Sequence, residues 1–428
     1  MSDPPPVLPE PPWPVAVIGA GAAGLLAAIF AARTGARVVA LETRPVPGAK
    51  IRVSGGGRCN ILPSRAELGD YATSGSRNTM RNLLFSWPIH EVRRFFEEEL
   101  RIPMKVEPNG KVFPSSDRSQ DVVAALLKEC QRRDVTILGD RRVQRVESLS
   151  VDNRRLFRLG FPVGSPMTCQ RLILATGGLS LPRTGSDGHG LAMACALGHA
   201  VRILHPALVP LLAKDPRWRE LSGISLPARL RATGGGRTLE EREGDLLFTH
   251  RGFSGPVVLD LSRHVTGPGG EQVRIDAAWL GSNAPDWGAI LREPGRRSVA
   301  ALLGEHLPRR LADWLLSLAR VPGMRTTSEL RREEREQLVR HLTECPLEVA
   351  GSEGYATAEV TAGGVPLEEI SPRTLESRIV PGLYFAGEVL DVVGRIGGFN
   401  FLWAWVTGRR AGEAAATSLE ESRGAPTS

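Results

Sequence analysis

Residues 15–41 alternate between short apolar runs and one longer apolar stretch with helical spacing. Residues 15–18 form a β-type run, residues 22–33 follow with an apolar helical pattern, and residues 37–41 form a second β-type run. Short apolar runs are typical of buried strands, and a longer apolar stretch between two of them is typical of the connecting helix. The pattern therefore predicts a strand–helix–strand unit with parallel strands.

The remainder of the chain divides into regions of different character. Helical patterns cover residues 89–100, 119–133, 297–345 and 400–418. Strand-like runs cover residues 172–175, 208–213, 246–249, 257–261, 273–276, 358–365 and 383–387. Between the first two helices, Asn109–Gly110 predicts the turn of a hairpin. Strand-like runs dominate between about residues 190 and 280, so this middle part is expected to be a separate unit.

Three glycines lie in the turn between the first strand and its helix. Gly19, Gly21 and Gly24 form a G-x-G-x-x-G motif, and the second strand ends in Glu42, 18 residues after Gly24. In a dinucleotide site the first glycine permits the turn, the second lets a pyrophosphate approach, and the third allows helix–strand packing. The acidic residue accepts ribose hydroxyls. The predicted contacts of this half are Gly19, Ala20, Gly21, Ala23, Gly24, Glu42 and Thr43.

A membrane span is the alternative interpretation of residues 15–32, which are apolar and long enough to cross a bilayer. Three glycines and the strand-forming start argue against it. The Pro-rich residues 1–14 include Asp3 and Glu10 and lack the basic start of a signal peptide. We therefore expect a disordered arm over residues 1–14, a disordered tail over 419–428 and no membrane partner.

Length and cysteine usage narrow the class of protein. A chain of 428 residues with 42% hydrophobic and 24% charged residues is typical of a soluble protein with two or three domains. Its five cysteines are scattered, without a C-x-x-C pair. This disfavours a disulfide framework, a zinc site and a dithiol centre, so we expect no metal and a cytoplasmic location.

The basic charge balance could indicate a nucleic-acid partner. The net charge is +7 and the isoelectric point is near 9.5. The arginines, however, occur as isolated pairs, and aromatic residues make up only 5% of the chain. A nucleic-acid surface usually combines clustered basic residues with aromatic side chains. We therefore expect solvated basic faces and attraction for an anionic cofactor, and no nucleic-acid partner.

Two further strands that end in glycine favour FAD over NAD as the dinucleotide. Residues 172–180 read LILATGGLS, and residues 382–391 read GLYFAGEVLD. In FAD proteins of the glutathione-reductase and fumarate-reductase type, the first segment lies near the phosphates and adenosine. The acidic residue of the second segment accepts a hydrogen bond from the ribityl chain. Glu388 occupies that position here, and Asp391 is the alternative acceptor.

The last predicted helix follows a Gly-Gly pair that ends in Gly398. Its start is expected to point at the pyrimidine end of the flavin, which carries negative charge when the flavin is reduced. A helix N-terminus stabilises such a nearby anion by about 0.3–1 kcal/mol when exposed. Gly408 and Gly412 predict close packing of this helix. Trp403 and Trp405 are interpreted as core residues.

With these motifs in place, the chain resembles the BaiN-like bacterial flavoproteins, which are NAD(P)/FAD-dependent oxidoreductases, over about residues 13–418. The resemblance rests on GAGAAG, KIRVSGGGRCN (residues 50–60), ATGG, FTHRGFSGP (248–256), EVTAGGV (359–365) and AGEVLDVVGRIGGFNFLWAW (386–405). It implies an α/β fold, in which a Rossmann-like FAD-binding domain is interrupted by an insert with a β-barrel part and a helical part. The expected domains are residues 15–190 and 356–418 for FAD and 191–355 for the insert.

The resemblance also implies the remaining FAD contacts. Residues 57–60 would lie beside the cofactor, residues 175–177 near its phosphates, and residues 363–364 against the flavin ring. The implied set is Lys50, Gly57, Arg58, Cys59, Asn60, Ala175, Thr176, Gly177, Gly363, Gly364, Gly387, Glu388, Gly398, Phe399 and Asn400. For Cys59, backbone contact with FAD is preferred over a covalent or redox role.

One class within this family reduces C=C bonds of oxidised bile acids. Such a reduction needs a proton donor and a cation, and His250 and Arg251 have suitable chemistry. The alternative is that their Gly-rich loop only connects two strands and that His250 has a structural hydrogen bond. Arg395 is a second candidate cation, with pairing to the pyrophosphate or a carboxylate as its alternative.

The leading functional hypothesis is an FAD-dependent oxidoreductase that acts on a small organic molecule. No second G-x-G-x-x-G is present, so NAD(P)H as electron donor would dock transiently. An RNA-associated flavoprotein, which modifies or binds tRNA, is the alternative suggested by the basic charge balance. A non-catalytic flavin sensor is a third possibility.

Overall fold

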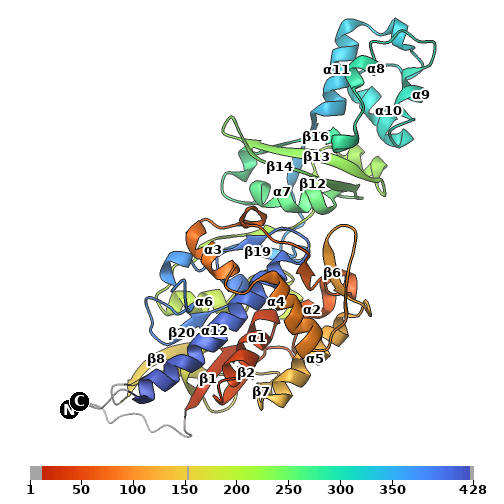
Figure 1. The fold of residues 1–428 in the computed structure, drawn as a ribbon. Coiled ribbons are helices and arrows are strands. Elements are labelled where there is room, and N and C mark those ends of the chain that lie inside the picture. Colours follow the sequence, from red (N-terminus) through yellow and green to blue (C-terminus); the bar gives the residue numbers. More distant parts are fainter. Residues whose placement is uncertain (1–11, 152–153, 425–428) are drawn as a thin grey trace. The chain divides into compact units, whose positions relative to one another are not determined.

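The computed structural model describes residues 12–151 and 154–424, and the chain forms two compact units (Figure 1). The terminal unit combines residues 1–204 with residues 360–428, and the insert unit comprises residues 205–359. The predicted insert, residues 191–355, thus begins and ends earlier than the observed one. The difference arises because residues 189–196 form helix α6, which belongs to the terminal unit.

The elements of the terminal unit come from both ends of the chain. Its strands are β1 (Trp13–Ile18), β2 (Val38–Leu41), β3 (Leu62–Pro63), β4 (Tyr71–Ala72), β5 (Met104–Val106), β6 (Lys111–Pro114), β7 (Thr136–Leu138), β8 (Arg145–Val151), β9 (Arg154–Gly160), β10 (Met167–Leu174), β19 (Val360–Gly364), β20 (Leu383–Phe385) and β21 (Val393–Gly394). Its helices are α1 (Ala22–Ala32), α2 (Ala49–Val53), α3 (Arg77–Leu84), α4 (Ile89–Arg94), α5 (Ser119–Arg132), α6 (His189–Ala196) and α12 (Phe399–Gly424). Strand β11 (Arg202–Ala207) pairs with β19 and runs from this unit into the insert.

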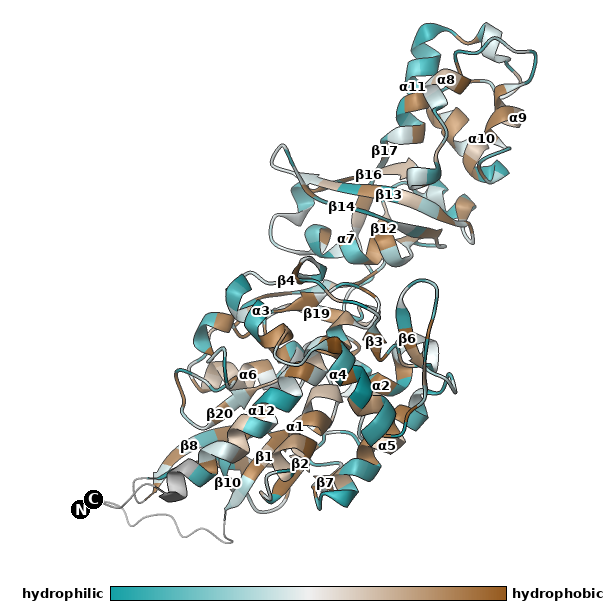
Figure 2. Cartoon of the chain, in the orientation of Figure 1, coloured by the Kyte–Doolittle hydropathy of each residue, from teal (hydrophilic) through white to brown (hydrophobic). Residues whose placement is uncertain are grey.

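A parallel sheet forms the centre of the terminal unit. The strand order is β7-β2-β1-β10-β9-β8, with β20 paired to β10. All neighbours from β7 to β10, and the β10–β20 pair, are parallel, and the β8–β9 hairpin is antiparallel. Figure 2 shows hydrophobic residues along β1 and β2 and hydrophilic residues on the outer surface of α5. Because the carboxyl ends of parallel strands share one edge, the loops after β1, β2, β10 and β20 meet there.

Helix α12 packs against α1 through two glycines. A Cβ atom on Gly408 would lie 2.4 Å from the carbonyl oxygen of Ala23, and one on Gly412 would lie 2.3 Å from that of Ala27. The predicted tight packing of this helix is therefore confirmed. Trp403 and Trp405 are buried in the core, as expected. The helix itself is longer than predicted and continues to Gly424.

Two predictions concern chain segments at or beside the ends of the described structure. The arm predicted over residues 1–14 lies outside the described residues up to position 11, and residues 13–14 begin β1. The tail predicted over residues 419–428 is helical to position 424, and its last four residues lie outside the described part.

The insert unit combines an antiparallel sheet with a group of helices. Its strands are β12 (Leu211–Ala213), β13 (Ser225–Gly234), β14 (Arg237–Phe248), β15 (Gly252–Ser254), β16 (Arg274–Trp279), β17 (Cys345–Leu347) and β18 (Val349–Ser352). Its helices are α7 (Pro256–Thr266), α8 (Trp287–Ile290), α9 (Val299–Leu303), α10 (Arg309–Leu318) and α11 (Arg332–Thr343).

The sheet of the insert unit is closed by the chain itself. Its seven strands run in the order β17-β16-β13-β14-β15-β12-β18, and all pairs are antiparallel. The two outermost strands are neighbours in sequence, separated only by Glu348. One continuous segment thus pairs with both edges, which gives the barrel-like part that the family resemblance implies.

One strand prediction in this unit is wrong. Residues 257–261, interpreted as strand-like, lie in helix α7. Gly255 (φ +90°) and Pro256 set the start of the helix, and Val257, Val258 and Leu261 form its buried face. A short apolar run fits a strand or one face of a helix equally well, and here the proline at the first helical position favours the helix.

Candidate functional site

The turn between β1 and α1 has room for a ligand at only one of its three glycines. A Cβ on Gly19 (φ +97°) would lie 2.5 Å from the carbonyl oxygen of Ala175, and one on Gly24 would lie 1.8 Å from that of Gly19. A Cβ on Gly21 would meet nothing within 4 Å. Gly21 also starts α1 without a side-chain cap, which leaves the helix N-terminus available for a phosphate.

Glu42, at the end of β2, lies beside this turn. The backbone N–H of Ala20 donates to Glu42 Oε2 at 2.8 Å, and that of Arg44 donates to Oε1 at 2.9 Å. These two bonds fix the carboxylate next to the glycine turn. Thr43 follows the end of β2, and Ala23 lies in the first turn of α1. The adenosine half of the predicted site is thus assembled by adjacent strand ends.

The loop after β10 forms the next wall. Ala175 continues the sheet through a hydrogen bond from its N–H to the carbonyl of Ile18. The hydroxyl of Thr176 is buried and has no hydrogen-bond partner among the described residues. Gly177 (φ +74°) approaches Ser186, since a Cβ there would lie 2.6 Å from Ser186 Oγ.

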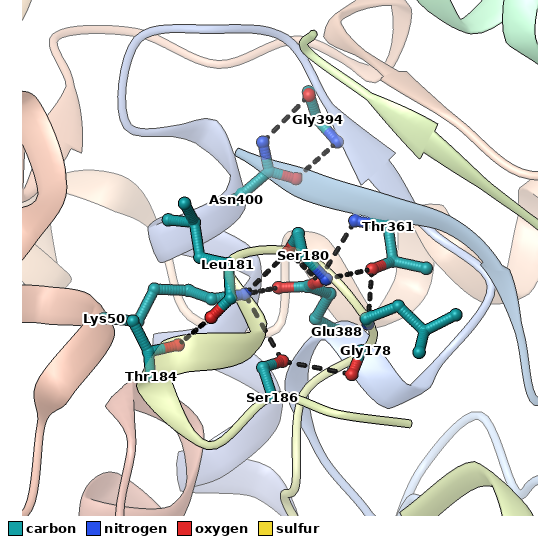
Figure 3. Close-up of polar contacts among 11 residues, drawn as sticks. Lys50, Gly178, Ser180, Leu181, Thr184, Ser186, Thr361, Glu388, Gly394 and Asn400 are labelled. Carbon is teal, nitrogen blue, oxygen red and sulfur yellow. Dashed lines mark hydrogen bonds and ion pairs between the residues drawn. The ribbon is translucent and has the colours of Figure 1, made fainter. Parts of the chain in front are cut away.

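A polar cluster gathers residues from four distant segments (Figure 3). Lys50 Nζ lies 2.8 Å from Glu388 Oε2 and also donates to Ser180 Oγ at 2.8 Å. The other carboxylate oxygen, Oε1, accepts from Ser180 Oγ at 2.7 Å and from the N–H of Thr361 at 3.0 Å. Gly387, with φ +79°, precedes Glu388 in the loop after β20. The cluster holds Glu388 in a fixed, partly buried position.

Asp391, the alternative acceptor, has another role. Its Oδ2 accepts hydrogen bonds from the N–H of Ser74 at 3.1 Å and from the hydroxyls of Ser74 and Thr73. It therefore anchors the loop after β4. Of the two acidic residues, Glu388 is the one that lies in the polar cluster with Lys50.

A second buried atom without a partner lies beside the residue that precedes α12. The side-chain oxygen of Asn60, Oδ1, has no hydrogen-bond partner among the described residues, and a Cβ on Gly398 would lie 3.0 Å from it. Asn400 instead bonds the backbone of Gly394 in both directions, at 2.8 and 2.9 Å (Figure 3). The ring of Phe399 packs edge-on against Tyr71. Asn400 thus fixes the loop before the helix.

Gly363 and Gly364 are required by backbone packing. A Cβ on Gly363 (φ +83°) would lie 2.3 Å from the carbonyl oxygen of Ile203, and one on Gly364 (φ +130°) would lie 2.7 Å from that of Val389. These contacts explain both glycines without a ligand, so their role as ring contacts is a proposal.

Among the described residues, the loop around Gly57 has no unpaired cation and no reactive thiol. Arg58 lies 2.6 Å from Glu107 and stacks over the ring of Phe113. Cys59 is fully buried with φ 62°, and burial raises the pKa of its thiol to about 12. A thiol with this pKa stays protonated near neutral pH and is a poor nucleophile. The geometry fits the preferred backbone role.

We expect Cys59 to resist alkylation in the native protein. At pH 8, iodoacetamide should leave Cys59 unmodified, because burial and its raised pKa suppress the thiolate, and should label the exposed Cys195. Peptide mass spectrometry would measure both sites. Labelling in denaturant provides the control, since both cysteines should then react; rapid native labelling of Cys59 would contradict its buried role.

Arg395 pairs with a carboxylate, as its alternative interpretation states. Its Nη1 lies 3.0 Å from Asp70 Oδ1, and its N–H donates to the carbonyl of Asp70 at 3.0 Å. This residue therefore connects the loop after β21 to the segment before β4.

His250 and Arg251 lie in the insert unit, at the turn between β14 and β15. Thr249 closes the turn, because its Oγ1 accepts from the N–H groups of Arg251 and Gly252. Arg251 lies 3.7 Å from Glu353. His250 is exposed and makes no hydrogen bond among the described residues. The loop does connect two strands, but no partner gives His250 a structural role.

The residues of the terminal unit fit an FAD. The open face at Gly21, the uncapped start of α1 and the fixed carboxylate of Glu42 suit the ADP half. Two buried oxygens, on Thr176 and Asn60, have no hydrogen-bond partner in the part of the chain that the structure describes. Buried polar atoms are normally hydrogen-bonded, so a ligand with donors would complete them.

Sequence reasoning missed Ser180 and Thr361 as members of the site. Ser180 donates to Glu388, and the hydroxyl of Thr361 accepts from the N–H groups of Leu179 and Ser180. Both lie within motifs that the sequence singled out, ATGGLS and TAGG. The hydroxyl side chain beside the glycines in each motif was the signal that could have identified these two residues.

Two features are absent within the described residues. Among residues 12–151 and 154–424, no group of three or more His, Cys, Asp and Glu side chains could hold a metal ion. No helix in the same part of the chain combines the length and apolar character needed to cross a membrane.

Comparison with known proteins identifies the family. The model of the HI0933-like protein Rossmann domain matches residues 13–414. The chain is 35% identical to a ribosomal RNA dihydrouridine synthase of Escherichia coli, covering 91% of this chain and 94% of that protein. It is 33% identical to a 3-dehydro-bile acid delta(4,6)-reductase of Clostridium scindens, covering 94% and 98%.

A solved structure shows the same fold at low identity. The 3-ketosteroid delta1-dehydrogenase of Sterolibacterium denitrificans superimposes with a TM-score of 0.51 at 12% identity, covering 96% of this chain and 100% of that one. The family match and both curated relatives extend over more than nine-tenths of the chain. The chain therefore belongs to the HI0933-like Rossmann family and is an FAD-dependent oxidoreductase.

Proposed function

We propose that this oxidoreductase reduces a carbon–carbon double bond conjugated to a carbonyl group in a small organic substrate, with NAD(P)H as electron donor. The observation that supports it best is the pair of curated relatives. One is named for a delta(4,6)-reductase and the other for a dihydrouridine synthase, over 94% and 91% of this chain. Both names describe the saturation of a double bond, although the substrates differ.

The terminal unit is proposed to hold the cofactor. Gly21 and the start of α1 would bind the pyrophosphate, Glu42 the ribose, and Glu388 the ribityl chain. When reduced, bound FAD supplies the hydride for one carbon of the double bond. Lys50 would orient Glu388 as an acceptor through their 2.8 Å ion pair.

His250 and Arg251 are the proposed proton donor and cation. The second carbon of the double bond requires a proton, and a histidine side chain can donate it as a general acid. A guanidinium can hydrogen-bond the substrate carbonyl, which becomes more negative as the double bond is reduced. The fixed turn at Thr249 supports this assignment, because it holds both residues on a defined loop.

A two-stage anaerobic experiment tests the proposed function. The purified protein should show a flavin spectrum that bleaches on addition of NADH or NADPH. The reduced protein should then be reoxidised stoichiometrically by a 3-keto steroid with a C4–C5 double bond, with mass spectrometry showing a gain of two hydrogens. A flavin that no pyridine nucleotide reduces would contradict the proposed donor, and failure to reoxidise would contradict the substrate class.

We expect His250→Gln to slow substrate reduction selectively. Loss of a positioned acid typically costs about 10²–10⁴ in rate. FAD content and the rate of flavin reduction by NAD(P)H should not change, because His250 lies outside the terminal unit. Stopped-flow reoxidation measures the affected step. His90→Gln, at another exposed histidine, is the control; equal reoxidation rates in both variants would remove His250 from the mechanism.

Ribosomal RNA is the second candidate substrate, because a 35% identical relative is named for it. The absence of a nucleic-acid partner therefore stays a prediction from the sequence. The charge distribution adds to this candidate. The insert unit contains 21 Lys and Arg and 21 Asp and Glu, so the terminal unit carries the whole surplus of +7. A basic surplus confined to one unit attracts a polyanion.

The RNA candidate has its own test. Reduced protein incubated with unmodified ribosomal RNA should raise the mass of one uridine by two hydrogens, detected by nuclease digestion and mass spectrometry. RNA affinity should fall steeply with salt, as phosphate contacts require. Reoxidation by the steroid without modification of RNA would favour the small substrate.

A further inference from the structure

The insert unit contains a cavity away from every residue assigned above. Its volume is about 510 Å³, within the range of small-ligand sites. It lies between the β13–β14 turn and the loop after α7, and all of its lining residues belong to the insert unit. Four basic side chains line it: His205, Arg237, Arg263 and His264. No described Asp or Glu does so.

A partly buried carboxylate behind the wall holds two of these basic side chains. Glu240 Oε2 lies 2.5 Å from Arg263 Nη2 and 2.7 Å from His264 Nε2, and Oε1 accepts from Arg242 Nε at 2.6 Å. Burial opposes the charge, but the hydrogen bond to His264 and the charges of Arg263 and Arg242 lower the pKa of Glu240 to about 2. Glu240 therefore stays ionised at physiological pH and keeps its partners oriented.

Arg237 is the cation that no carboxylate neutralises. It is exposed at the start of β14, and among the described residues it forms no ion pair or side-chain hydrogen bond. The turn before it consists of Gly235 (φ +56°) and Gly236 (φ +75°), and a Cβ on either would meet nothing within 4 Å. Successive backbone N–H groups in such a turn can contribute to an anion site.

We propose that this cavity binds a phosphate group, carried either by a small phosphorylated molecule or by RNA. Cations on separate sides of the cavity can contact different phosphate oxygens, and an arginine can do so with two parallel bonds. Leu239 and Val273 supply apolar wall for the remainder of the ligand. The site is independent of the proposed reduction, since it uses no residue assigned to FAD or to the substrate.

The test uses the full chain loaded with FAD, so that the dinucleotide site is occupied. Calorimetric titration at low salt would measure the binding of inorganic phosphate and of a ten-nucleotide single-stranded RNA. We expect saturable binding, and Arg237→Ala should weaken it roughly tenfold or more, because hydrogen bonds to charged groups contribute about 1.5–3 kcal/mol. Arg237→Glu, which reverses the charge, should abolish it.

Arg309→Ala is the matched control. Arg309 is an arginine of the same unit with a side chain 93% exposed, and it does not line the cavity. Unchanged binding in this variant, together with loss in Arg237→Ala, would support the site. Tighter binding of RNA would assign the phosphate to a polynucleotide, and equal binding would assign it to a small ligand. No saturable binding by the unaltered protein, or equal loss in both alanine variants, would overturn the proposal. Flavin reduction, measured on the same samples, reports separately on the proposed function.

Discussion

Gly21→Ala is expected to weaken FAD binding by roughly 5- to 150-fold while the apoprotein remains folded. The backbone at Gly21 has φ −82° and ψ −161°, which alanine adopts without strain, and a Cβ there would meet no protein atom within 4 Å. Because no described protein atom lies in the way of the methyl, the group that it would displace is a ligand at the start of α1. Overpacking of this kind typically costs about 1–3 kcal/mol, which corresponds to the stated loss of affinity.

Two measurements separate the effect on the ligand from an effect on the fold. Quenching of flavin fluorescence on titration into apoprotein gives the affinity, and thermal unfolding of the apoprotein gives its stability. Gly69→Ala is the control, because Gly69 is exposed and a Cβ there would also meet nothing within 4 Å. If Gly21→Ala protein is purified with a full complement of FAD and binds it as tightly as Gly69→Ala protein, the pyrophosphate does not lie at this turn.

The elements that the sequence predicted best are those whose chemistry is local. The G-x-G-x-x-G turn, its flanking strands and Glu42 lie within 28 consecutive residues, and Gly19 and Gly24 have an immediate steric reason to be glycine. Strand ends such as Thr176 and Gly387 could be placed near one another because parallel strands share their carboxyl edge. The glycine motif, together with the rule that parallel strands share their carboxyl edge, was sufficient to predict this half of the site.

Contacts between distant segments could not be derived in this way. The Lys50–Glu388 ion pair joins positions 338 residues apart, and no periodicity or motif specifies that pairing. Likewise, the sequence leaves Asp391 as an alternative to Glu388 for the ribityl acceptor. Only the fold shows that Asp391 bonds to Ser74 and that Glu388 faces Lys50. These choices depend on tertiary packing.

The composition gives the size of the net charge but does not show where in the structure the charge lies. The net charge of +7 is a property of the whole chain, but the insert unit is electrically neutral. Within that neutral unit, Arg263 is neutralised by Glu240 and Arg237 is not. A count of charges cannot separate these two arginines, because the distinction depends on which carboxylate lies within bonding distance.

Gly408→Ala is expected to destabilise the terminal unit, although alanine has a higher intrinsic helix propensity than glycine. In an exposed helix, replacing glycine by alanine stabilises by about 1 kcal/mol. Here the added Cβ would lie 2.4 Å from the backbone carbonyl oxygen of Ala23, and backbone of α1 cannot rotate away as a side chain can. Separating the helices would also disturb the second close contact, at Gly412. We expect a net loss of about 2 kcal/mol, at the upper end of overpacking costs after the propensity gain is subtracted.

Thermal unfolding of the FAD-free protein measures this loss. For a unit of this size, about 2 kcal/mol corresponds to a melting temperature lower by roughly 4–8 °C. Thr417→Ala is the matched control, because Thr417 lies on the exposed side of the same helix. It introduces the same residue without a contact to α1, so its melting temperature should equal or exceed that of the unaltered protein. Should Gly408→Ala prove as stable as Thr417→Ala, the two helices do not pack through these glycines, and the contact that joins the ends of the chain around the dinucleotide site is incorrect.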